Sequence, residues 1–226
     1  MRTSYSGTNP MVYGRYGVRA WAAPLPGTRV VVKDPFAILS MPLVHRLTGA
    51  TSVLLYRHPG ASLTSYRRMG WVPDTEELKP IIETFTAKNG PVSGVTQPPP
   101  SSEGEVAMMA WFWNALYGMA LHDGAGLGKD LLVVAHEDIA GGGTEVARRL
   151  FELLDLEWSD RVAEELNRSG SSRKVDTAAL HNLDRNPTQV AHEWSTKVSP
   201  AEREQLELAT RDVRTLLEQR AHELLS

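Results

Sequence analysis

The sequence contains no cysteine, no long apolar run and no strong excess of charge of one sign. The absence of cysteine excludes disulfide bonds, cysteine metal ligands and a cysteine nucleophile, and it is compatible with a reducing compartment. No apolar run reaches the roughly 18 residues of a membrane helix, and the start of the chain lacks the pattern of a secretory signal. A formal net charge of −3 gives no reason to expect nucleic acid or an anionic membrane as partner. These absences predict a soluble, cytoplasmic protein.

Several motifs of catalysis and binding are also absent. The chain has no His-Glu-x-x-His, Gly-x-Ser-x-Gly or Gly-x-Gly-x-x-Gly pattern, and no group of residues has the spacing of metal ligands. Metalloprotease, α/β-hydrolase and dinucleotide-dehydrogenase functions are therefore excluded, and no metal site is expected. With 226 residues the chain is long enough for one α/β domain with a sizeable core.

The rest of the sequence is best interpreted around residues 51–71. A short apolar run at 53–56 is bounded by polar and turn-forming residues, which is typical of a buried parallel strand. Arg57 stands where this strand should end, and Pro59 suits the first position of a helix because it has no N–H to leave unbonded. A guanidinium beside the outward-pointing N–H groups of a helix start predicts a phosphate site. An ion pair between Arg57 and a neighbouring carboxylate is the structural alternative.

Two further runs predict strands of the same sheet. Residues 29–33 should form a strand that ends at Lys33, with Asp34 as the N-cap of the next helix. Residues 131–135 should form another strand, followed by the acidic pair at 137–138. Open α/β sheets bind ligands at the carboxyl ends of their strands, so Lys33 is a candidate for the reaction centre or the acceptor pocket. A surface lysine beside a capping aspartate is the alternative.

Three segments together resemble the sulfotransferase family, whose donor is 3'-phosphoadenosine 5'-phosphosulfate. Arg57 at a strand end, with Ser65 eight residues later in the next helix, resembles the family's motif for the 3'-phosphate. Residues 30–35 are similar to the strand that runs into Lys-Thr-Pro or Lys-Asp-Pro in bacterial members. Residues 133–139 are similar to the family's strand that ends in a Glu-Asp-hydrophobic signature. The three matches occur in the family's order along the chain.

The resemblance implies a fold and a set of ligand residues. The implied fold is α/β, a three-layer P-loop type with a mostly parallel central sheet. It is expected to be truncated at its N-terminus, because the family's first strand and phosphate loop have no counterpart. Arg57 and Ser65 would bind the 3'-phosphate of the nucleotide. Arg185, Trp194 and Lys197 are loosely similar to the late segment that closes over this phosphate in the family.

The implied function is transfer of a sulfonate group from 3'-phosphoadenosine 5'-phosphosulfate to a hydroxyl or amine of a small-molecule or carbohydrate acceptor. Lys33 would lie near the reaction centre, and the sequence identifies no catalytic base. Turnover then depends on whether the missing phosphate loop is supplied or compensated. Two alternatives remain: a truncated, non-catalytic module that binds nucleotide or a partner, and a P-loop kinase of small molecules. The sequence leaves a homodimer open.

The chain as a whole is expected to form one domain, 1–226. Residues 1–28 should be an irregular arm, and 88–104 a loop or lid rich in proline and glycine. Residues 105–121 are apolar on nearly all sides, which predicts a helix in the centre of the core. The C-terminal helix, 199–226, begins with a capping box, Ser-Pro-Ala-Glu.

Overall fold

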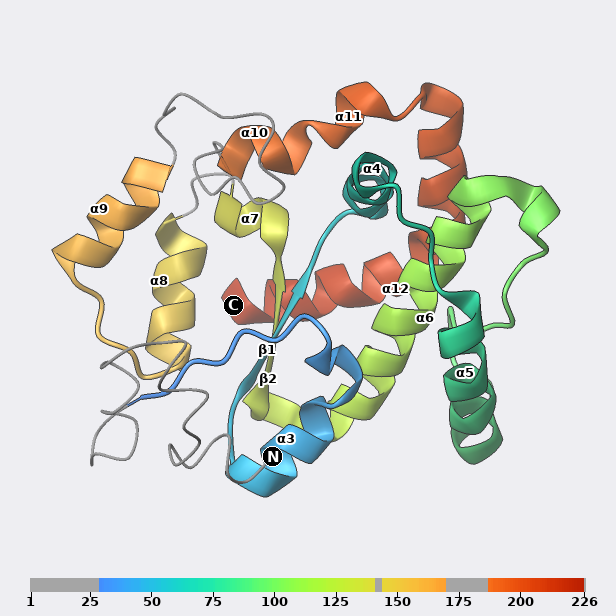
Figure 1. The fold of residues 1–226 in the computed structure, drawn as a ribbon. Coiled ribbons are helices and arrows are strands. Elements are labelled where there is room, and N and C mark those ends of the chain that lie inside the picture. The colour runs from blue at the N-terminus through green and yellow to red at the C-terminus, as the bar shows by residue number, and fades with distance from the viewer. Residues whose placement is uncertain (1–28, 141–143, 170–186, 226) are drawn as a thin grey trace, which may run out of the picture.

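The computed structural model describes residues 29–140, 144–169 and 187–225, which are mostly helical around a small parallel sheet (Figure 1). The α-helices and strands of these residues are α3 (Met41–Thr48), β1 (Ser52–Tyr56), α4 (Pro59–Met69), α5 (Thr75–Asn89), α6 (Gly104–Gly124), β2 (Leu131–Ala135), α7 (His136–Ala140), α8 (Thr144–Leu153), α9 (Asp160–Ser169), α10 (Pro187–His192), α11 (Trp194–Lys197) and α12 (Pro200–Leu225). Short 3-10 turns are η2 (Ala37–Leu39), η3 (Ser101–Glu103) and η4 (Ala125–Asp130). The predicted arm, 1–28, lies outside the described residues.

The sheet consists of β1 and β2, which run parallel in a register from Ser52 opposite Leu131 to Tyr56 opposite Ala135. The chain between them passes through α4, α5 and α6, because a parallel pair needs a long crossover connection. The predictions of a strand at 53–56 and of another at 131–135 are confirmed. Since the last residues of both strands are paired, the chain leaves both strands at the same edge of the sheet.

The two faces of the sheet are covered to different degrees. Leu54 and Val133 are buried on the face that packs against α3, α6 and α12, and α12 passes behind the strands in Figure 1. On the opposite face Val134 is buried in a cluster with side chains of α8 and the end of α12. Val53 and Leu55, on this second face of β1, remain 42% and 46% exposed. Among the described residues, helices therefore cover both faces of β2 but only one face of β1.

Helix α6 is the predicted central helix, and it fixes the end of β1. Trp111 and Trp113 are only 5% and 2% exposed. The indole N–H of Trp113 donates a hydrogen bond of 2.9 Å to the backbone oxygen of Arg57, and the hydroxyl of Tyr117 donates one of 3.5 Å to that of Leu55. The tryptophan and tyrosine side chains thus hold the backbone at the point where β1 ends.

The predicted strand at 29–33 is wrong. The segment is extended but unpaired, and Val30, Val31 and Val32 are between 52% and 82% exposed. A run of valines forms a strand only where neighbouring backbone groups complete its hydrogen bonds, and no described residue pairs with this one. The parallel sheet of the described residues is therefore limited to two strands. Asp34 does accept a hydrogen bond of 2.9 Å from the Phe36 N–H, but a 3-10 turn follows before α3 begins.

The remaining connections are held by specific contacts. Within the 88–104 loop Val95 is buried, and the Thr96 oxygen accepts a hydrogen bond of 2.8 Å from the indole of Trp111. The capping box of α12 is confirmed, because Ser199 and Glu202 exchange backbone-to-side-chain hydrogen bonds of 2.8 and 3.3 Å.

Over the ranges that the structure describes, every helix is too short or too polar to cross a membrane.

Candidate functional site

Arg57 and His136 stand next to each other at the carboxyl edge of the sheet. Tyr56 pairs with Ala135, and adjacent strands lie about 4.8 Å apart, so the next residue of each chain leaves the sheet beside the other. Both side chains are half-buried. Burial lowers the pKa of His136, and the charge of Arg57 lowers it further. The guanidinium therefore lies close enough to the imidazole for its charge to affect the pKa of His136.

The start of α4 is closed by its own N-cap residue, His58. The Nδ1 atom of His58 accepts a hydrogen bond of 3.1 Å from the Gly60 N–H. Its backbone oxygen accepts from the N–H groups of Ala61 and Ser62, at 2.9 and 3.2 Å. These first-turn donors are the ones that the sequence predicted to face a phosphate. In this structure these donors bond to His58, so an anion at this edge would depend on side chains for its hydrogen bonds.

His58 is itself a structural residue. The backbone N–H of His58 donates a hydrogen bond of 2.9 Å to a carboxylate oxygen of Glu137, which ties the start of α4 to α7. Its ring stacks on Trp194, with centroids 3.8 Å apart and planes inclined by 11°. Burial, followed by the charges of Arg214 and Arg203, lowers the pKa of His58 to about 4. The imidazole is therefore neutral at pH 7. The bond from the His58 backbone N–H gives Glu137 a structural role at the start of α4.

Trp194, which the resemblance assigned to nucleotide binding, packs on the start of α4. Its ring lies so close to Gly60 that a Cβ on this glycine would be 2.4 Å from the ring. The guanidinium of Arg203 lies 5.4 Å from the ring centroid, within the range of a cation–π contact. The structure thus brings Trp194 to the helix that follows Arg57, and glycine at position 60 is what permits this approach.

The other predicted site residues are less closely grouped. Ser65 is half-buried in α4, and its hydroxyl makes no hydrogen bond to any described residue. Lys197 is exposed on α11 and forms an ion pair with Glu193. Lys33 is exposed in the unpaired segment that precedes α3, and Arg185 lies outside the described residues. Of the predicted site residues, the structure therefore brings Arg57 and Trp194 near each other. Arg57 begins the segment 57–60, and Trp194 packs on His58 and Gly60 of the same segment.

Sequence reasoning missed three basic residues near this edge: His136, Arg203 and Arg214. His136 follows a predicted strand in the same way as Arg57, so its position was a usable signal. Arg203 and Arg214 are eleven residues apart on α12, or about three helical turns, and this spacing puts them on one face. Their approach to His58, with Arg214 Nη1 at 3.5 Å from His58 Nε2, depends on long-range packing that the sequence does not reveal.

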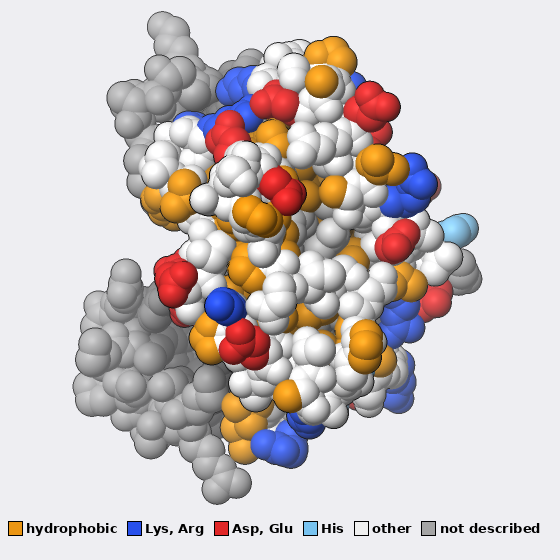
Figure 2. Space-filling model, turned by 90° about the vertical axis from the view of Figure 1, so that its right-hand side faces the viewer, with side chains coloured by type: hydrophobic (Ala, Val, Ile, Leu, Met, Phe, Trp, Pro, Cys, Tyr) orange, Lys and Arg blue, Asp and Glu red, His pale blue; other side chains and the backbone are white. Residues whose placement is uncertain are grey.

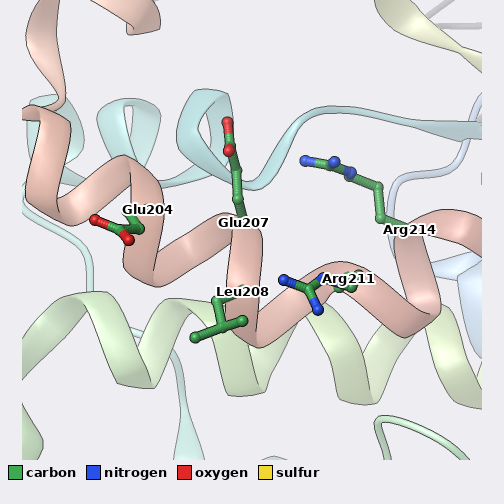
Figure 3. A pocket seen from close by; sticks show the side chains of 5 residues that line it. All are labelled: Glu204, Glu207, Leu208, Arg211 and Arg214. Carbon is green, nitrogen blue, oxygen red and sulfur yellow. The ribbon is translucent and has the colours of Figure 1, made fainter.

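A surface pocket adjoins this region on α12. Its lining is Glu204, Glu207, Leu208, Arg211 and Arg214. Figure 3 shows Glu207 and Arg214 extending from the same side of α12, with the Arg214 guanidinium directed toward the Glu207 side. Two carboxylates balance two guanidinium groups here. The charges are similarly mixed on the molecular face in Figure 2, where acidic and basic side chains are interspersed.

Comparisons of the chain with family models, with curated proteins and with solved structures find no match. Among the described residues, no group of three or more histidine or carboxylate side chains could hold a metal ion. The function is therefore inferred from the residues at the carboxyl edge of the sheet and from the sequence motif to which Arg57 and Ser65 belong.

Proposed function

We propose that the carboxyl edge of the β1–β2 sheet binds the 3'-phosphate of 3'-phosphoadenosine 5'-phosphosulfate, with Arg57 as the principal ligand. In this proposal the chain belongs to the sulfotransferase family and has a three-layer P-loop fold, and it transfers the sulfonate group to a hydroxyl or amine of an acceptor. The observation that carries the proposal is the parallel pairing of 52–56 with 131–135. Arg57 thereby follows a strand at the edge where α/β sheets bind phosphorylated ligands.

Several properties of the edge support phosphate as the ligand. A guanidinium binds phosphate through two parallel hydrogen bonds, and Arg57 is half-buried, where such bonds are stronger than in water. The Ser65 hydroxyl makes no hydrogen bond to any described residue and can donate to a ligand. Trp194 offers a half-buried aromatic ring that is 136 positions from His58 in sequence but stacks on it in space.

Sulfonate transfer makes a bond from the acceptor oxygen or nitrogen to sulfur while the bond from sulfur to the bridging oxygen of the nucleotide breaks. The acceptor proton passes to a base, and cations stabilise the charge that develops on the bridging oxygen. Lys33 is the candidate cation in this proposal. It lies in the exposed segment before α3, so it has to approach the nucleotide from outside the sheet.

A second candidate function is nucleotide binding without transfer. Two observations favour it: the exposure of Lys33 and the occupied N–H groups at the start of α4. Both reduce the number of positive groups that could surround a transferring sulfonate. The two candidates share the phosphate site and differ only in whether the bound donor reacts.

Calorimetric titration of adenosine 3',5'-bisphosphate into the full chain tests the phosphate site. We expect micromolar binding that Arg57→Ala weakens by about 10- to 100-fold, because a hydrogen bond to a charged group contributes roughly 1.5–3 kcal/mol. Ser65→Ala should weaken binding by about fivefold, as expected for one ordinary hydrogen bond. Arg68→Ala is the matched control, since this exposed arginine of α4 should leave the affinity unchanged.

The same protein then distinguishes the two candidates. Release of adenosine 3',5'-bisphosphate from the donor, dependent on added hydroxyl or amine acceptors and reduced by Lys33→Ala, supports sulfonate transfer. Binding with no release supports the non-catalytic function. If the wild-type chain does not bind the bisphosphate at all, or binds it equally well after Arg57→Ala, the phosphate site itself is contradicted.

A further inference from the structure

We propose that His136 couples phosphate binding at Arg57 to the uptake of a proton. The inference rests on the proposed phosphate site and adds a role for a residue that the sulfotransferase resemblance did not include. The imidazole is neutral while the site is empty and becomes an imidazolium when a phosphate dianion arrives. The affinity for the nucleotide should then increase as the pH falls through the neutral range.

The position of His136 is fixed by the strand register. It is the first residue after the last paired residue of β2, and Arg57 is the first after the last paired residue of β1. The imidazole is half-buried, and its Nδ1 atom is enclosed with no hydrogen-bond partner among the described residues. Buried polar atoms without partners are rare, and each requires an explanation. Because Nδ1 is enclosed, a ligand would meet the exposed part of the half-buried ring, where an imidazole beside an arginine is suited to acceptor oxygens.

The charges around His136 keep it neutral in the empty site. Burial and the positive charge of Arg57 lower its pKa, and the carboxylate of Glu137 opposes them with a smaller effect. The neighbouring Asp138, on the same helix, has a pKa raised by burial and by Glu137. Helices α8 and α10 pack against α7. Their titratable groups are Glu145, Arg148, Arg149 and Glu152 on α8, and His192 on α10.

A bound phosphate reverses this balance. A phosphate monoester carries a charge of about −1.5 to −2 near pH 7, which more than offsets the charge of one guanidinium. A negative group bound at Arg57, beside the imidazole, favours the charged form of His136 and raises its pKa. The imidazolium can then donate a charge-assisted hydrogen bond to a phosphate oxygen. Between the two pKa values of His136, empty and bound, each binding event takes up part of a proton from the buffer.

Titration of the wild-type full chain with adenosine 3',5'-bisphosphate, in two buffers of different ionisation heat, measures this proton directly. We expect net uptake near pH 7, and His136→Gln should abolish it. The variant should also bind about tenfold more weakly at pH 6.5, the effect of one charge-assisted hydrogen bond, with a smaller difference at pH 8.5. Comparing variant with wild type at each pH cancels the ionisation of the ligand itself.

His122→Gln is the matched control, because His122 is exposed and lies far from Arg57. It is near the end of α6, beside Gly124, which lies next to Leu131 at the start of β2 and thus at the edge of the sheet opposite to His136. It should leave both affinity and proton uptake unchanged. His136→Asn serves as a second variant if His136→Gln does not fold. Binding without proton uptake between pH 6 and 8, or unchanged uptake in the variants, overturns the role of His136 but not the phosphate site. Absence of binding overturns both.

Discussion

Two runs of this chain contain consecutive valines, but one forms a buried, paired strand and the other is unpaired and exposed. Residues 131–135 form β2, in which Val133 and Val134 are 2% and 1% exposed. Residues 29–33 also contain consecutive valines, flanked by Arg29 and Lys33, yet the three valines at 30–32 lie unpaired and largely exposed. The difference shows that β-branched residues permit a strand, whereas a neighbouring strand and a covering helix decide whether one forms.

The basic residues that follow the predicted strands at 53–56 and 29–33 differ in the same way. Arg57 follows a paired strand, and its backbone oxygen is held by the indole of Trp113 at 2.9 Å. Lys33 follows the unpaired segment and is exposed. A ligand site needs side chains whose backbones are fixed before the ligand arrives, because ordering them on binding costs affinity. Arg57 meets this requirement, and Lys33 does not.

The largest effect that separates the paired strands from residues 29–33 is expected from Leu54→Ala in β1. Leu54 is 4% exposed in β1, so its truncation should lower the free energy of unfolding by about 2–5 kcal/mol. Val31→Ala, at a side chain that is 82% exposed, should change it by less than about 0.5 kcal/mol. Urea denaturation measures both.

Leu55→Ala is a control within the same strand, since this neighbour of Leu54 is 46% exposed on the opposite face. Its effect should lie between the other two. A cost for Val31→Ala as large as that for Leu54→Ala would mean that residues 29–33 are buried in solution, and it would remove the contrast between the regions.

A smaller effect is expected from Gly60→Ala at the start of α4. The new Cβ would meet the Trp194 ring at 2.4 Å, and such overpacking costs about 1–3 kcal/mol. The tryptophan fluorescence should change as α11 is displaced. Gly126→Ala, with no atom within 4 Å of the added Cβ, is the control and should be close to neutral. Equal stability of the two variants would show that Trp194 does not pack on α4.

The pH dependence of stability gives a third test, of similar or smaller size. His58 has a pKa of about 4 in the folded state against an ordinary value of 6.5, so the unfolded chain binds more protons between these values. Stability should therefore be greatest above pH 6.5 and fall by about 1–3 kcal/mol as the pH decreases to 4.

His58→Asn should flatten this part of the stability profile while keeping a side-chain acceptor for the helix start. The difference between wild type and variant isolates His58 from the other titrating groups. A variant with the same slope as the wild type would place the titration elsewhere.

The sequence predicted those features that local pattern determines. It gave the two paired strands, the apolar helix α6, the capping box of α12 and the position of Arg57 at a strand end. It did not predict that His58 would occupy the N–H groups at the start of α4, because an imidazole rarely acts as an N-cap. Nor did it predict that Arg67 would bind the carboxylates of Glu105 and Glu202 and so join α4 to α6 and α12. Such contacts span up to 135 positions in the chain and depend on the complete fold.

The central claim is that the Arg57 guanidinium binds a phosphate at the 3' position of a nucleotide. A thermodynamic cycle tests it most directly: adenosine 3',5'-bisphosphate and adenosine 5'-monophosphate are each titrated into the wild type and Arg57→Ala. The account predicts that the wild type prefers the bisphosphate by about 10- to 100-fold and that Arg57→Ala loses this preference. A preference of the same size in both proteins would contradict the account.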